Sequence, residues 1–201
     1  GVCLVPQRHP VYTAKQVADL DYLSGGRVDF GVGIGWLKEE FDALGIPFGS
    51  RARRTLECLE VMKALWVQKV TEHDSDHFRI HGALQNPKPH QRPHPPIYFG
   101  GESGPALRRV AQYGQGWYGF QLTPEALVER LGVLDAALSA AGRRREDIRV
   151  AIGSRGRSGP DDLRKFRDLG VDQLITPVFA TDAAGFLRRL DKLAEHMSAL
   201  D

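Results

Sequence analysis

A helix–strand–helix pattern within residues 21–45 constrains the fold of this chain more than any other feature. Residues 27–34 alternate apolar side chains with Asp29 and two glycines, so they predict a strand with one apolar side and one nearly bare side. Residues 24–26 (Ser-Gly-Gly) end the helix before this strand, and residues 38–40 (Lys-Glu-Glu) begin the helix after it. Such a unit is typical of parallel α/β proteins, which bind ligands at the carboxyl ends of their strands.

The same pattern recurs along the chain. Six strand-like segments are each followed by helical sequence, at residues 1–5, 27–34, 96–101, 116–120, 148–152 and 171–178. A complete (β/α)₈ barrel needs about 250 residues. The sequence therefore predicts an α/β fold of the TIM-barrel type with six β/α units, in which the first two units are absent. The last helix, residues 182–200, is expected to turn four apolar side chains inward: Leu187, Leu190, Ala194 and Met197.

Residues 70–96 interrupt the alternation of strands and helices. They are interpreted as an insertion loop within a single domain of residues 1–201. His73, His77 and His81 stand four apart, a spacing that on a helix suits a metal ion. A turn signal at residues 74–76 and strand-like alternation after it argue against a helix, so no metal site is predicted. The proline-rich tract that ends the insertion favours a rigid crossing over the barrel surface, with a polyproline ligand as the alternative.

Composition excludes several classes of partner. The chain has 27 basic and 25 acidic residues and a formal charge of +2, which gives no reason to expect nucleic acid or a membrane as a partner. Two cysteines, Cys3 and Cys58, argue against a disulfide scaffold and favour a cytoplasmic protein. The chain starts with Gly1 inside an apolar run, so we expect a preceding part of the protein to be absent.

The turn after residues 96–101 predicts an anion site. The strand ends in paired glycines, Ser103 is a candidate N-cap and Pro105 lies in the first helical turn. This arrangement leaves backbone N–H groups free at the positive end of a helix. The pattern matches neither a P-loop nor a Rossmann fingerprint, so those classes of nucleotide-binding protein are not supported. A merely tight strand-to-helix turn is the alternative.

Three stretches together resemble one known family, the bacterial-luciferase-like superfamily of flavin- and deazaflavin-dependent oxidoreductases. They are Val-Pro-Gln-Arg-His-Pro at residues 5–10 running into Ala-Lys at 14–15; residues 20–27 continuing through Gly-Val-Gly-Ile-Gly-Trp at 31–36; and Pro-Pro-Ile at 95–97 continuing through Gly-Gly-Glu-Ser at 100–103 to Gly-Trp at 116–117. The similarity extends to about residue 141 and is greatest to the branch of probable coenzyme F420-dependent oxidoreductases. It implies a TIM barrel.

The resemblance also implies roles for particular residues. His9 would be catalytic, with hydrogen bonding to the backbone as the alternative. The cofactor-binding residues implied are Ile34 and Gly35 against the ring system, Glu40 (or Glu39) near the cofactor side chain, and Gly101, Glu102, Ser103 and Gly104 around its phosphate. The chain departs from the family by having Gln115 where the family often has Asp. Family residues on the first two strands, some with acid–base roles, are not in this sequence.

These implications predict an oxidoreductase that transfers a hydride between coenzyme F420 and a small organic substrate. The alternatives are a monooxygenase that uses FMN, and a truncated, non-catalytic barrel that only binds a cofactor or a partner. A homodimer is possible, because family members are commonly dimers. The enzyme hypothesis requires the glycine-lined strand after Phe30 and the turn that begins at Gly100 to face one cavity and bind one elongated, phosphorylated cofactor.

Overall fold

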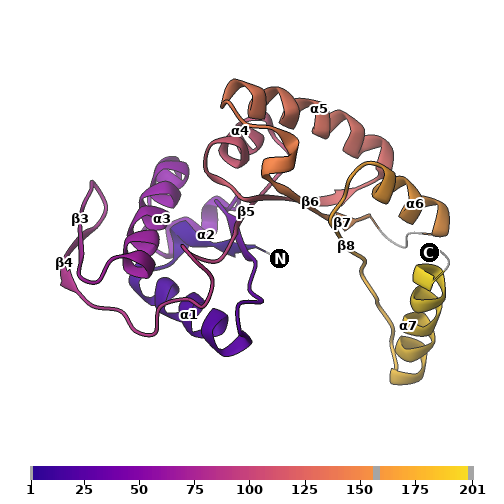
Figure 1. Cartoon of the computed structure of the whole chain (residues 1–201), viewed down its shortest axis with the longest axis horizontal. Helices are drawn as coiled ribbons and strands as arrows, with labels where there is room; N and C mark the ends of the chain where they lie inside the picture. The colour runs from indigo at the N-terminus through magenta and orange to yellow at the C-terminus, as the bar shows by residue number, and fades with distance from the viewer. Residues whose placement is uncertain (1, 156–158, 199–201) are drawn as a thin grey trace. The chain divides into compact units, whose positions relative to one another are not determined.

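The computed structural model describes residues 2–155 and 159–198, which form two compact units, Gly1–Ile97 and Tyr98–Asp201. Six parallel strands occur in the order β1-β2-β5-β6-β7-β8. Their bounds are β1 Cys3–Leu4, β2 Phe30–Gly33, β5 Ile97–Gly100, β6 Gly116–Leu122, β7 Arg149–Ser154 and β8 Gln173–Ile175. Each is followed by a helix, so the predicted α/β fold with six β/α units is confirmed (Figure 1).

The helices in the first unit are α1 (Pro10–Ser24), α2 (Lys38–Ala43) and α3 (Arg51–Val67), with short 3₁₀ turns η1 (Val5–Gln7) and η2 (Phe48–Ser50). β1 pairs with β2 in parallel. α1 packs against α3, with Ala14 and Trp66 both fully buried (Figure 1). The Trp66 indole N–H donates to the Ala14 carbonyl oxygen at 2.9 Å, so the largest side chain of this core has its polar atom satisfied.

The proline-rich tract crosses the helices of its own unit. Asp21 is fully buried at the end of α1, where its two carboxylate oxygens accept hydrogen bonds at 2.8 Å from the backbone N–H and the side-chain amide of Gln91. Lys88 donates to the carbonyl oxygens of Leu65 and Gln68 at the end of α3, both at 2.6 Å. These bonds fix the tract across α1 and α3, in agreement with the predicted crossing.

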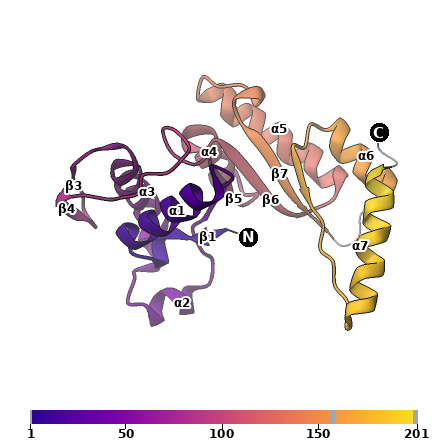
Figure 2. The same cartoon turned by 60° about the horizontal axis from the view of Figure 1, so that its bottom comes forward.

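The first part of the predicted insertion forms an antiparallel β-hairpin of β3 (Thr71–Asp74) and β4 (Arg79–Ala83), which lies beside α3 in Figures 1 and 2. His73 lies in β3 and His81 in β4, so the spacing of the histidines along the sequence is not helical. Within residues 2–155 and 159–198, no three histidine, cysteine or acidic side chains are grouped as metal ligands.

The base of this hairpin contains buried polar atoms without partners. Among the described residues, Thr71 Oγ1, His73 Nε2 and both amide atoms of Gln85 have no hydrogen bond. A buried amide without partners costs about 1–3 kcal/mol relative to one that is satisfied.

We therefore expect Gln85→Met, which keeps the shape and removes the amide, to raise the unfolding free energy by about 1 kcal/mol. Chemical denaturation measures the effect. Gln112→Met is the matched control, because Gln112 is exposed on α4 (Gly104–Tyr113) and its replacement should leave stability unchanged. A clear loss of stability in Gln85→Met would contradict the prediction and indicate ordered water on the amide.

The second unit is built on β5, β6, β7 and β8, which pair in parallel. Its helices are α4, α5 (Pro124–Ala140), α6 (Pro160–Asp168) and α7 (Ala183–Ser198), with a 3₁₀ turn η3 (Arg145–Asp147). Trp117 from β6 is fully buried in this unit, as are Leu127 and Leu134 from α5. No helix of the described residues combines the length and the apolar character that crossing a membrane requires.

Arg143 binds carbonyl oxygens at the carboxyl end of α4. Its Nη1 group donates to the carbonyl oxygens of Ala111 and Gly114, both at 2.9 Å, and Nη2 donates to that of Asp147 at 3.0 Å. The last carbonyls of a helix lack partners within the helix, so a guanidinium there satisfies them and interacts favourably with the helix dipole. The basic run at residues 143–145 thus has a structural role in this unit.

The prediction for the last helix is wrong in one respect. α7 has the expected apolar spacing, but none of its described side chains is buried: Leu187 and Met197 are each 58% exposed. α7 contacts α6, and Figures 1 and 2 show it beside α6 rather than against the strands of its unit. An apolar stripe predicts that a helix has a face to bury, but it does not say what buries that face.

Candidate cofactor-binding site

In the first unit, the end of β1 opens onto a hollow of about 470 Å³. The turn η1 follows β1 directly, because Pro6 cannot continue a strand ladder, and it turns the Gln7 side chain toward this hollow. The lining residues are Val2, Cys3, Leu4, Gln7, Arg8 and Leu44. The hollow thus lies at the carboxyl end of a parallel strand, where α/β proteins bind their ligands.

Gln7 connects this hollow to the segment after β2. Its side-chain amide donates to the Glu40 carboxylate at 3.0 Å. Gly35 has φ +77°, and a Cβ there would lie 2.7 Å from Cε2 of Phe41 and 3.5 Å from the Gln7 amide nitrogen. Only glycine fits that conformation and that spacing without strain. The structure therefore brings together Gln7, Gly35 and Glu40, and the half-buried Ile34 lies directly before Gly35.

His9 lies in different surroundings. It is the N-cap residue of α1, and its carbonyl oxygen accepts hydrogen bonds from the backbone and the hydroxyl of Thr13, both at 3.1 Å. Its exposed ring makes edge contacts with Tyr12 and with Phe78 of the hairpin, at centroid distances of 6.0 and 6.1 Å. Among the described residues, His9 is not one of those that line the hollow.

In the second unit, β5 ends in a turn that is fixed by hydrogen bonds to β6. The Gly101 N–H donates to the Tyr118 carbonyl oxygen at 3.3 Å, and the Trp117 indole N–H donates to the Gly101 carbonyl oxygen at 2.9 Å. Gly101 has φ +109°, which favours glycine. These constraints give the start of α4 a defined position on the sheet of its own unit.

The Glu102 side chain bends back to β6 rather than projecting from the turn. Its carboxylate accepts a hydrogen bond from the Phe120 N–H at 2.7 Å, and its backbone carbonyl accepts one from Arg130 at 3.3 Å. Burial, and then the negative charge of Glu102, raise the pKa of the Tyr118 hydroxyl. Because the carboxylate is occupied in this way, the group of Glu102 that is available to an anion is its backbone N–H.

The first turn of α4 leaves donors free. Ser103 is the N-cap, as predicted, and its hydroxyl accepts a hydrogen bond from the Ala106 N–H at 3.3 Å. Pro105 has no N–H to offer. Among the described residues, nothing accepts from the N–H groups of Glu102, Ser103 or Gly104. Three backbone donors at the positive end of a ten-residue helix make an arrangement that suits a phosphate group.

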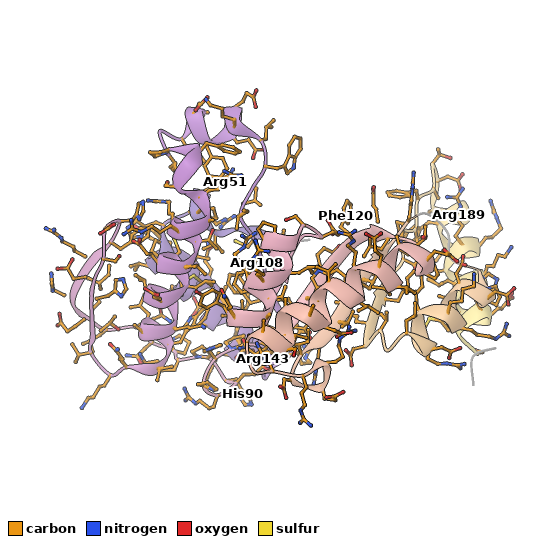
Figure 3. The ribbon with its side chains drawn as sticks, turned by 90° about the horizontal axis from the view of Figure 1, so that it is seen from above. Arg51, His90, Arg108, Phe120, Arg143 and Arg189 are labelled. Atoms are coloured by element: carbon orange, nitrogen blue, oxygen red, sulfur yellow. The ribbon has the colours of Figure 1, made fainter. Side chains whose placement is uncertain are left out.

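Arg108 adds a positive charge that the sequence reasoning missed. Its Nη1 group lies 3.6 Å from the position that a Cβ on Gly104 would occupy, one helical turn earlier on α4 (Figure 3). Within the described part of the chain, no ion pair or hydrogen bond occupies its guanidinium. The spacing of four between residues 104 and 108 was the available signal, because residues i and i+4 share a helix face.

A buried carboxylate on α3 binds the insertion. Glu57 on α3 accepts hydrogen bonds from the His77 ring at 2.9 Å, the His77 N–H at 3.0 Å and Arg53 at 3.0 Å. Burial raises the pKa of Glu57, but hydrogen bonds from the ring and backbone of His77 outweigh burial and lower the pKa to about 2. Two of the three histidines have separate acidic partners: the His77 ring contacts Glu57 and the His81 ring contacts Glu72.

Comparison with known proteins gives a family match. The model of the family described as luciferase-like monooxygenase matches residues 1–163. An uncharacterized protein of Mycobacterium tuberculosis, Rv0953c, is 32% identical over 196 residues, covering 94% of this chain and 67% of that protein. The FMNH(2)-dependent dimethylsulfone monooxygenase of Pseudomonas putida is 39% identical over 112 residues, covering 54% of this chain and 31% of that protein.

Solved structures confirm the fold type. The monooxygenase RslO1 from Streptomyces bottropensis aligns with a TM-score of 0.82 at 20% identity, covering 99% of this chain and 76% of that one. An F420-dependent secondary alcohol dehydrogenase aligns with a TM-score of 0.66 at 19% identity, covering 97% and 69% of the two chains. At such identities the likeness concerns the fold, which is the TIM-barrel type predicted from the sequence.

Proposed function

Because the chain belongs to the luciferase-like monooxygenase family, we propose that it is an oxidoreductase that transfers a hydride between coenzyme F420 and a small organic substrate. The observation that carries this proposal is the set of free donors at the start of α4. The N–H groups of Glu102, Ser103 and Gly104, together with the Arg108 guanidinium, fit a phosphate group, which both F420 and FMN carry.

The proposal assigns cofactor-binding roles to residues within each unit. When bound, the cofactor would supply the redox chemistry, as an acceptor or donor of hydride. In the first unit, Ile34 and Gly35 would offer a close backbone surface to the ring system, and Glu40, held by Gln7, would face the cofactor side chain. In the second unit, Gly101 would give the turn between β5 and α4 the backbone conformation that the proposed phosphate site needs.

His9 is the proposed proton donor or acceptor in hydride transfer, because an imidazole ring has nitrogens that can donate and accept hydrogen bonds and protons. Its exposed ring beside Phe78 and Tyr12 is accessible to a substrate. The proposed substrate is a small organic molecule, and the proposed location of the protein is the cytoplasm. A homodimer stays a prediction, which sedimentation measurements can test.

An FMN-dependent monooxygenase is the second candidate. It is favoured by the match to the dimethylsulfone monooxygenase, whose name specifies FMNH(2). The third candidate, a non-catalytic barrel that only binds, shares the phosphate site and predicts binding without turnover.

Titration of the full-length protein with F420 and with FMN, followed by fluorescence, tests the proposal. We expect micromolar or tighter binding of F420; tighter binding of FMN would favour the monooxygenase. If neither binds more tightly than about 1 mM, equivalent to only about 4 kcal/mol, the proposed function is wrong. Turnover that requires oxygen would favour the monooxygenase over hydride transfer to an organic substrate.

Replacing Arg108 should weaken binding through the phosphate. We expect Arg108→Ala to lower the affinity for a phosphorylated cofactor about ten- to hundredfold, because a hydrogen bond to a charged group contributes about 1.5–3 kcal/mol. Riboflavin has the ring system of FMN without its phosphate, so the variant should bind riboflavin as wild type does. Arg164→Ala, which removes a guanidinium paired with Asp161 on α6, is the matched control. An equal loss for riboflavin and FMN would contradict the phosphate role of Arg108.

A further inference from the structure

The tip of the β3–β4 hairpin is a compact turn of residues 75–78. The Ser75 N–H donates to the Phe78 carbonyl oxygen at 2.9 Å, and the Phe78 N–H donates to the Ser75 hydroxyl at 3.3 Å. These bonds close the turn on itself. The turn therefore moves as one piece, and whatever holds one of its residues also positions the others.

Glu57 holds this turn on α3. One carboxylate oxygen accepts from both the ring and the backbone N–H of His77, and the other accepts from Arg53, which also pairs with Asp76 of the turn. The Glu57 side chain is only 9% exposed, so these bonds form in surroundings with little competing water. The carboxylate is the single group on α3 that reaches the turn through several bonds at once.

Phe78 connects the turn to His9, the candidate catalytic residue. Its ring is 7% exposed and makes the edge contact with the His9 ring at 6.1 Å. The Arg54 guanidinium lies over the Phe78 ring, 4.8 Å from its centroid, and also donates to the Pro6 carbonyl oxygen at 2.9 Å. A continuous series of contacts thus runs from Glu57 through the turn to His9, within one unit.

We propose that Glu57 is a positioning residue: by holding residues 75–78 on α3 it keeps Phe78 against the ring of His9 and so fixes the orientation of that ring. The inference depends on the proposed function in one respect, the assignment of His9 as a catalytic residue. The His9 ring thus has two aromatic neighbours, Phe78 from the turn and Tyr12 from α1.

Hydrogen exchange and NMR of the full chain at pH 7 test this inference. In Glu57→Gln we expect amide exchange in residues 71–83 to become at least tenfold faster. We also expect the His9 ring protons to lose the ring-current shift caused by Phe78, and so to match their position in Phe78→Leu. His77→Ala, which keeps the backbone donor and removes the ring, should give a smaller change of the same kind.

Glu60→Gln is the matched control, because Glu60 is an exposed carboxylate on the same helix. The inference is overturned if Glu57→Gln behaves like this control in both measurements, or if Phe78→Leu leaves the His9 signals unmoved. Should Glu57→Gln fail to fold, His77→Ala decides the question. Both measurements are made without a cofactor, so a protein that binds neither F420 nor FMN would defeat the proposed function and leave this result standing.

Discussion

Gly116→Ala is expected to lower the unfolding free energy by up to about 3 kcal/mol, the upper end of the range for overpacking a well-filled core. A Cβ at Gly116 would lie 2.3 Å from Cδ1 and 2.4 Å from Cε1 of Tyr98, its partner on β5. The Tyr98 ring is only 6% exposed, so it has little room to move aside. Denaturant unfolding, with the slope checked for two-state behaviour, measures the loss.

Gly132→Ala is the matched control for this substitution. Gly132 lies on α5 with nothing within 4 Å of the position of its Cβ, so the added methyl group meets no neighbour. Alanine favours the helical state over glycine by about 1 kcal/mol, and the control should therefore be stabilised. A Gly116→Ala protein as stable as wild type would show that β5 and β6 adjust more easily than their packing implies.

Acidification should remove the stability that Glu57 contributes. The pKa of Glu57 is about 2 in the folded protein, below its ordinary value of 4.5, so folding favours the ionised form. The stabilisation is present at and above about pH 5 and is lost as the pH falls through the folded pKa. The difference corresponds to about 3 kcal/mol at most, at about 1.4 kcal/mol for each pKa unit.

The measurement compares unfolding free energies of wild type and Glu57→Gln from pH 7 to pH 2. We expect the wild type to be more stable at pH 7 and the two curves to converge in acid, because only the wild type loses a negative charge at this position. Other carboxylates titrate in both proteins and cancel in the difference. Curves that stay parallel over this range would contradict the assigned role of the carboxylate.

The sequence predicted the features that depend on local chemistry. The glycines at 25 and 26 take φ +67° and +83° at the end of α1, and Ser103 caps α4 with Pro105 behind it. These outcomes follow from the conformational range of glycine and the hydrogen bonding of short polar side chains. The six strands were found because alternation and short apolar runs are visible in any single sequence.

Contacts between distant residues could not be predicted in the same way. Glu57 and His77 are twenty positions apart, and nothing in either segment specifies that one carboxylate holds the hairpin. Gln7 and Glu40 are separated by thirty-three positions. Gln7 and His9 lie two positions apart in the chain, yet their side chains have different surroundings, Glu40 for Gln7 and Phe78 for His9. Packing, rather than local propensity, decides these cases.

Arg143 has a consequence for the far end of α4. Arg143 ties the final carbonyls of α4 to η3, so the helix is held at the end opposite its first turn. If the first turn binds an anion, as proposed, its backbone donors are already aligned and little ordering of the chain is needed. Arg143, thirty-nine positions after Gly104, would then keep the proposed anion site rigid before a ligand binds.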